Sequence, residues 1–144
     1  MKQKNKHIFV FGIFAVDLSF YVDKKVKPGE TIIAKSSNIG PGGKASNQAI
    51  SARKLGASTT LITRLGNDNF SSYANNIWRR EKLFASTTID KNLPTGMAGI
   101  FIDDKTGENS VIVDPGASAN LCIDDFYSQK SKIKKGDIFL TQFE

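Results

Sequence analysis

The 144-residue sequence has very few of the side chains that form disulfides and bind transition metals. It contains one cysteine, Cys122, and one histidine, His7. A single cysteine excludes an internal disulfide framework and a multi-cysteine metal site, and a single histidine excludes a zinc site with two histidine ligands. Scarce cysteine is typical of a reducing compartment, so we expect a cytoplasmic protein.

Long apolar runs are also lacking. No run approaches the roughly 20 residues that a membrane-spanning helix needs. The N-terminal MKQKNKHIFVFGIF has the positive flank and the apolar run of a signal peptide, but the run contains Gly12, soon reaches Asp17 and lacks a small-residue cleavage site. We therefore predict that residues 7–11 form a buried strand and that the protein has no membrane partner.

Acidic residues are outnumbered by basic ones, 14 to 20, which gives a formal net charge of +6. A basic balance suggests nucleic-acid binding. The positive residues gather in the N-terminal tail, at Arg79 and Arg80, and in 130–135, where cations also suit exposed helix faces and helix ends. Because no zinc-finger or RNA-binding aromatic motif accompanies them, we predict no nucleic-acid partner and keep a basic nucleic-acid module as the weakest alternative.

Apolar periodicity predicts alternating strands and helices along the chain. Strands are expected at 7–11, 59–65 and 138–143. Helices are expected at 44–55 and at about 124–132, and a further helix is expected to begin after Asp68, which would be its N-cap. This alternation favours a parallel α/β sheet. Residues 31–34 and a hairpin of 97–102 with 110–113, turning at Gly107, do not fit that sheet and predict a small β extension.

The segment NIGPGGKASNQAISARKLGA, residues 38–57, places two adjacent glycines directly before a predicted helix. Gly42 and Gly43 allow a sharp bend or a close approach of the backbone to a ligand. The helix start adds free N–H groups and a partial positive charge. Lys44 and Asn47 share a face of its first turn, where an ammonium and an amide suit hydroxyl groups or an anion. A tight turn capped by a helix is the simpler alternative.

The same segment lacks two nucleotide-binding motifs. A P-loop needs glycine where this chain has Asn38 and serine or threonine where it has Ala45. The dinucleotide motif G-x-G-x-x-G also fails, because Gly40 and Gly42 are followed by Ala45. The segment is therefore not a standard nucleotide cradle.

A carboxylate, Asp17, follows the first predicted strand closely. The carboxyl ends of parallel strands are where open α/β sheets hold ligands. An ionised carboxylate accepts hydrogen bonds from two adjacent hydroxyls at once, as a sugar diol presents them. A turn residue is the alternative, so the argument depends on the combination of Asp17 with the glycine-rich turn.

An ordered set of short segments resembles the N-terminal half of ribokinase-like (PfkB-family) carbohydrate kinases. The segments are GIFAVDLSF, PGETI, GPGGKASNQAISARKLGA, TRLGNDNF, TGMAGIFI, DPGASANL and TQFE, and the resemblance extends from about residue 8 to residue 144. The resemblance implies a Rossmann-like three-layer α/β/α sandwich, here incomplete. It also implies a small β lid over the sugar site, formed by segments of about 18–40 and 95–115. In many members this lid builds a homodimer interface.

The resemblance further implies which residues bind a sugar substrate: Asp17, Gly43, Lys44 and Asn47, and a glutamate after a later strand that matches Glu144. On this interpretation the glycines let the backbone close on a polyol, while Lys44 and Asn47 bind its hydroxyls. Ala15 departs from the family pattern, because ribokinases carry asparagine two positions before the aspartate. A lost amide weakens the assignment to ribose itself, since unpaired sugar hydroxyls disfavour binding.

The family transfers the γ-phosphoryl group of ATP, with Mg²⁺ bridging the phosphates. Its aspartate base and anion hole come from a Gly-Ala-Gly-Asp type segment of the C-terminal half, and residues 1–144 contain no such segment. We therefore expect residues 1–144 to be the N-terminal part of a kinase domain without the ATP-binding half. Such a truncated sugar kinase would have no catalytic base and would not bind ATP and Mg²⁺ alone. The alternative is a non-catalytic sugar-binding or dimerisation partner.

Overall fold

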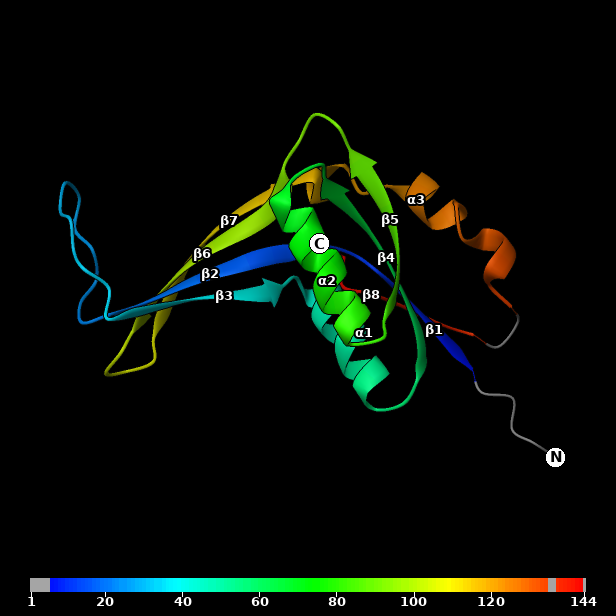
Figure 1. Cartoon of the computed structure of the whole chain (residues 1–144), viewed down its shortest axis with the longest axis horizontal. Helices are drawn as coiled ribbons and strands as arrows, with labels where there is room; N and C mark the ends of the chain where they lie inside the picture. Colours follow the sequence, from blue (N-terminus) through cyan, green and yellow to red (C-terminus); the bar gives the residue numbers. More distant parts are fainter. Residues whose placement is uncertain (1–5, 135–136, 144) are drawn as a thin grey trace.

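Two four-stranded β-sheets form the framework of the computed structural model, which describes residues 6–134 and 137–143 (Figure 1). The first sheet has the order β5-β4-β1-β8, and all of its strands run parallel. Its members are β1 (His7–Phe11), β4 (Ser58–Gly66), β5 (Phe84–Asp90) and β8 (Ile138–Thr141). The predicted parallel sheet is therefore confirmed.

Helices α1 (Lys44–Lys54) and α2 (Asn69–Arg80) pack on one face of this sheet. Trp78 lies at the centre of their interface with the sheet, where its ring meets Phe14 edge-on at 5.2 Å and its indole N–H donates to Ser46 Oγ at 3.1 Å. Both partners of Trp78 are fully buried. The remaining core comes from strand and helix positions that face each other, namely Val10, Leu61, Leu65, Ala45, Ala49, Ala74 and Ile77.

Helix α3 (Ile123–Tyr127) supplies the third layer, on the opposite face. Phe126 packs edge-on against Phe11 and Phe139 of the sheet. The buried Asp125 carboxylate ties the helix to two strands, because it accepts from Arg64 Nε at 2.9 Å and from the Thr88 hydroxyl. The expected incomplete three-layer α/β/α sandwich with a small additional sheet is thus confirmed.

The second sheet has the order β3-β2-β6-β7 and projects away from the helices (Figure 1). Its strands are β2 (Ala15–Val22), β3 (Ser36–Gly42), β6 (Thr95–Asp103) and β7 (Asn109–Gly116). Strands β2 and β6 run parallel, while both edge strands are antiparallel to their neighbours. The predicted hairpin is confirmed as β6 and β7, with Gly107 at a φ of 74° in the turn.

Three sequence expectations were wrong or incomplete. Residues 31–34 form no strand, because pairing with β2 begins at Ser36 and runs into the glycine-rich turn. The helix expected at about 124–132 is two short pieces, α3 and a 3₁₀ turn at Lys130–Lys132. The sequence analysis did not predict strands β2 and β5. Both carry polar residues on one face, so neither shows the continuous apolar run that is typical of a strand buried on both faces.

Asp68 joins the two sheets at the start of α2. Its carboxylate caps the helix by accepting from Ser71 N–H at 2.9 Å, and it also accepts from the backbone N–H and the hydroxyl of Thr95 at 2.7 and 2.8 Å. Thr95 is the buried first residue of β6. Burial raises the pKa of Asp68, but these hydrogen bonds outweigh burial and hold the pKa below its ordinary value.

We expect Asp68→Asn to lower the free energy of unfolding by about 1–3 kcal/mol, because the new amide NH₂ would face the buried N–H of Thr95. Urea denaturation measures the change. The matched control Asp124→Asn, on an exposed residue of α3, should change it by about 0.5 kcal/mol at most. Because the pKa of Asp68 is lowered, its contribution is present above the ordinary carboxyl pKa of 3.8 and is lost as the pH falls below it. Equal loss in both variants would contradict this role.

Candidate functional site

The predicted site residues lie where the two sheets separate, at the carboxyl ends of the parallel strands. Strand β1 ends at Phe11, and the chain enters β2 of the second sheet at Ala15, four residues later. Strand β3 returns from that sheet and ends at Gly42, opposite Ala15, and α1 begins at Lys44. The junction therefore brings a strand start, a strand end and a helix N-terminus together.

Asp17 follows the first strand, as its place in the sequence indicates, but it lies within strand β2 and is not the turn residue of the alternative interpretation. Its half-buried carboxylate rests on the backbone of Gly42. A Cβ added to Gly42 would lie 2.0 Å from Asp17 Oδ1, so no larger residue fits there while the carboxylate keeps its place. No donor among residues 6–134 and 137–143 bonds to this carboxylate, and burial raises the pKa of Asp17.

Gly43 holds the start of α1 against the segment that links β1 to β2. Its φ of 83° is in the left-handed region, and an added Cβ would lie 2.5 Å from the Ile13 carbonyl oxygen and 2.7 Å from Phe14 Cα. Both glycines therefore allow a close approach of protein to protein. The approach of this backbone to a ligand stays a prediction.

Lys44 and Asn47 are exposed on the first turn of α1, whereas Ala45 and Ser46 between them are buried in the core. Helical spacing puts the two exposed side chains on one face. The structure thus brings Asp17, Gly43 and Lys44 to one junction, with Asn47 one turn further along the helix. Glu144, the fifth predicted residue, lies outside the described residues.

Gln142, which the sequence analysis did not single out, lies beside this junction. Its amide Nε2 donates to Gln48 Oε1 of α1 at 2.5 Å, and its Oε1 lies 2.6 Å from where a Cβ of Gly12 would be. That oxygen is buried and has no hydrogen-bond partner among the described residues. Gln142 therefore fastens the end of β8 to α1, and its place in the TQFE segment was the one available signal.

Two other types of site are absent from the described residues. No group of three or more His, Cys, Asp or Glu side chains is arranged to hold a metal ion. None of the helices in the same part of the chain is long and apolar enough to cross a bilayer.

Comparison with known sequences gives a consistent result. Residues 5–142 match the description of a pfkB family carbohydrate kinase. The chain is 34% identical over 139 residues to a ribokinase of Dictyostelium discoideum, which covers 96% of this chain and 43% of that protein. It is also 34% identical over 140 residues to a deoxyribokinase of Salmonella typhi, covering 95% of this chain and 45% of that protein. The chain thus spans less than half the length of these relatives.

Solved structures share the fold. A ribokinase from Giardia lamblia superposes with a TM-score of 0.88 at 26% identity, over 96% of this chain and 45% of that chain. An Arabidopsis thaliana ribokinase complexed with ribose and ATP superposes with a TM-score of 0.66 at 28% identity, over 78% of this chain and 36% of that chain.

The two ends of α1 offer a test of the Gly43 packing. We expect Gly43→Ala to lower the free energy of unfolding by about 2–5 kcal/mol, from left-handed backbone strain and the clash with residues 13–15. Gly56, after the other end of α1, has a φ of 91° but open space around it. Gly56→Ala should therefore lower the free energy of unfolding through backbone strain alone, by about 1–2 kcal/mol. Chemical denaturation of both variants compares them, and equal losses would show that the packing contributes nothing.

Proposed function

The chain belongs to the pfkB family of carbohydrate kinases, and we propose that residues 1–144 carry the sugar-binding part of a ribokinase-like sugar kinase. The observation that supports this most is the Asp17 carboxylate, which rests on Gly42 beside the start of α1 without a donor from the described residues. A half-buried acceptor without a donor is unfavourable, so hydroxyl groups of a ligand would stabilise it.

The proposed roles follow from the chemistry of each side chain. Ionised Asp17 accepts hydrogen bonds from two neighbouring sugar hydroxyls. The Lys44 ammonium donates to hydroxyl oxygens, and the Asn47 amide can both donate and accept. Gly43 sets the direction in which the first turn of α1 presents these groups, and Glu144 would add a second acceptor. Several directed hydrogen bonds of this kind give a polyol site its specificity.

A pentose is the substrate class that we propose, and Ala15 bears on its identity. The buried Ala15 methyl replaces the asparagine of ribokinases, so one sugar hydroxyl would find no amide partner here. A pentose that lacks one hydroxyl loses nothing at that position. The chain is equally identical to a ribokinase and to a deoxyribokinase, and we therefore propose that 2-deoxyribose competes well with ribose.

Phosphoryl transfer would need groups that residues 1–144 do not contain. ATP would supply the phosphoryl group and Mg²⁺ would neutralise charge on its phosphates. The sequence has neither a Gly-Ala-Gly-Asp segment nor a standard nucleotide cradle. We propose that this chain by itself binds sugar weakly and does not turn over ATP, and a coupled ADP-release assay with pentoses, hexoses and nucleosides tests this.

Sugar binding should depend on Asp17 and on its ionisation. We expect Asp17→Asn to weaken ribose or 2-deoxyribose binding at least about tenfold in isothermal titration calorimetry, because charge-assisted hydrogen bonds are lost. Burial raises the pKa of Asp17. The affinity for sugar should therefore fall as the pH is lowered toward the pKa of Asp17 and the carboxylate is protonated, and Asp17→Asn should remove this pH dependence.

Two further variants make the sugar test specific. Asp124→Asn is the matched control and should bind like the parent chain. Gly42→Ala, at a position without a left-handed φ, should displace the Asp17 carboxylate and weaken binding similarly while the fold persists. Binding that survives both Asp17→Asn and Gly42→Ala would show that the sugar lies elsewhere.

A second candidate function, a partner that assembles through its lid, is supported by the exposed edge strand β7. Val111, Ile112 and Val113 are 50%, 69% and 56% exposed. Strand register aligns Val113 with Ala98 and Asp17, so Val111 and Val113 lie on the face that carries Asp17, and Ile112 lies on the other. We propose a homodimer in which the second lid covers the Asp17 face and shields bound sugar from water.

The alternation of faces along β7 supplies its own control. We expect Val113→Lys to shift the protein from a dimer to a 15.8 kDa monomer in size-exclusion chromatography with light scattering, because a charge would be buried in the interface. Ile112→Lys, one residue away on the opposite face, should leave the dimer intact. A monomeric parent chain, or dissociation by Ile112→Lys alone, would contradict the proposal.

A further inference from the structure

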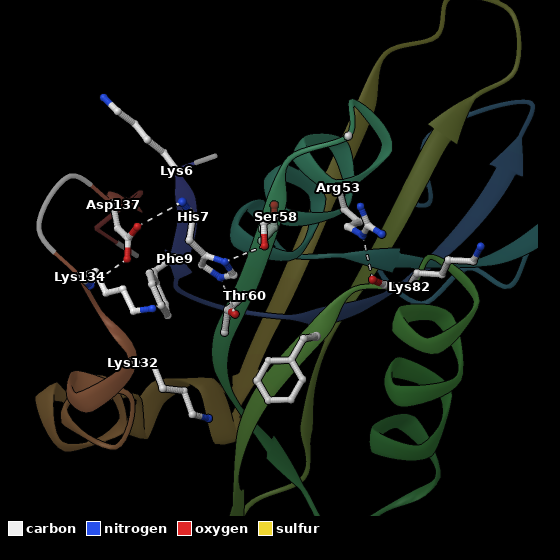
Figure 2. A pocket seen from close by; sticks show the side chains of 13 residues that line it. Lys6, His7, Phe9, Arg53, Ser58, Thr60, Lys82, Lys132, Lys134 and Asp137 are labelled. Carbon is white, nitrogen blue, oxygen red and sulfur yellow. Dashed lines mark hydrogen bonds between the residues drawn. The ribbon is translucent and has the colours of Figure 1, made fainter. Parts of the chain in front are cut away.

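A basic pocket of about 860 Å³ lies at the amino ends of the parallel strands (Figure 2). His7, Ser58 and Phe84 line it from the first positions of β1, β4 and β5. The candidate sugar site lies beyond the other end of the same strands. Four residue steps along β1 separate the two edges by roughly 13 Å, so the pocket is distinct from the sugar site.

Positive charge dominates the lining of the basic pocket. Among the described residues, five cations line it, namely Lys6, Arg53, Lys82, Lys132 and Lys134, against one carboxylate, Asp137. That carboxylate already accepts from the backbone N–H groups of His7 at 3.2 Å and Lys134 at 2.8 Å. None of the five cations forms a salt bridge with a carboxylate of the described residues.

The hydrogen-bond acceptors of the Arg53 and Lys132 side chains are neutral. Arg53 Nε donates to the Lys82 carbonyl oxygen at 2.9 Å, as the dashed line in Figure 2 marks. Lys132 Nζ donates to Gln129 Oε1 at 2.9 Å and lies 5.3 Å from the ring centre of Phe84. Five cations against one carboxylate, Asp137, leave an excess of positive charge in the lining, and an anion between the cations would reduce their mutual repulsion.

The opposite wall of the pocket is polar and fixed. The His7 ring nitrogens lie 2.8 Å from Ser58 Oγ and 2.8 Å from Thr60 Oγ1, so two hydroxyls of the neighbouring strand β4 hold the ring in place. The Phe84 side chain is 55% exposed and offers an apolar surface near Lys132. Cations, hydroxyls and an exposed ring around a cavity of this size suit a small-molecule ligand.

We propose that the basic pocket binds a small phosphate-bearing anion. Phosphate oxygens accept charge-assisted hydrogen bonds from lysine and arginine, and such bonds are the strong ones. Lys82 lies in the segment after α2 and Lys132 in the turn after α3, so the lining of the pocket joins both layers of helices. The anion is either inorganic or the phosphate of a nucleotide whose base stacks on Phe84.

Charge-only variants test the site. Isothermal titration calorimetry at fixed ionic strength would use inorganic pyrophosphate and AMP as probes. We expect Lys82→Gln with Lys132→Gln to weaken binding of pyrophosphate at least about tenfold. The matched control, Lys27→Gln with Lys105→Gln, removes the same charge from exposed positions outside the pocket and should bind like the parent chain.

Two further variants test whether the phosphate belongs to a nucleotide and whether the basic pocket binds independently of the sugar site. Phe84→Leu should weaken AMP and spare pyrophosphate if a nucleotide base stacks there, and should spare both if the anion is inorganic. Asp17→Asn should leave pyrophosphate affinity unchanged, so failure of the sugar proposal and failure of this one are distinguishable.

Three results would overturn the anion site. The first is a parent chain that binds neither probe, and the second is an equal loss of binding in both double lysine variants. The third is binding of a single-stranded oligonucleotide without binding of pyrophosphate or AMP, which would indicate a nucleic-acid surface instead.

Discussion

The contact on which the site depends is the packing of backbone and carboxylate against two adjacent glycines. Asp17 occupies the space where Gly42 would have a side chain, and the 13–15 segment occupies the space beside Gly43. The same two residues therefore fix the start of α1 and the position of the acidic side chain. Because both close approaches are made by protein groups, the glycines shape the candidate site through contacts within the protein.

The two edges of the parallel sheet have opposite electrostatic character. At the carboxyl edge the N-terminus of α1 presents its positive dipole end beside the Asp17 carboxylate. At the amino edge the helices end, and the basic residues there compensate the negative ends of their dipoles, as Arg53 does in the last turn of α1. The positive charge of the basic pocket is greater than this compensation requires. Lys132, for example, lies in neither α1 nor α2 and so does not compensate the dipole of either helix.

Much of the core architecture followed from sequence, and the failures have identifiable physical causes. The buried strand at 7–11 and the Asp68 cap were predictable, since both depend on local patterns of apolar and capping residues. Strand β3 was not, because the proline and glycines in SSNIGPG indicate a turn, whereas pairing with β2 extends them. Strand β5 is rich in serine and threonine, which hydrogen-bond to α3 and its following turn, and that contact is unknown until the layers are assembled.

The sequence by itself determined the family, the parallel sheet and the candidate residues Asp17, Gly43, Lys44 and Asn47, because their types and spacing are local properties of the chain. Only the tertiary structure decided that Asp17 projects from a strand of the second sheet onto Gly42, and that Gln142 fastens β8 to α1. It also brought lysines from residues 6 to 134 around one pocket. These relations join residues far apart in the chain, and strand register and layer packing fix them rather than any local pattern.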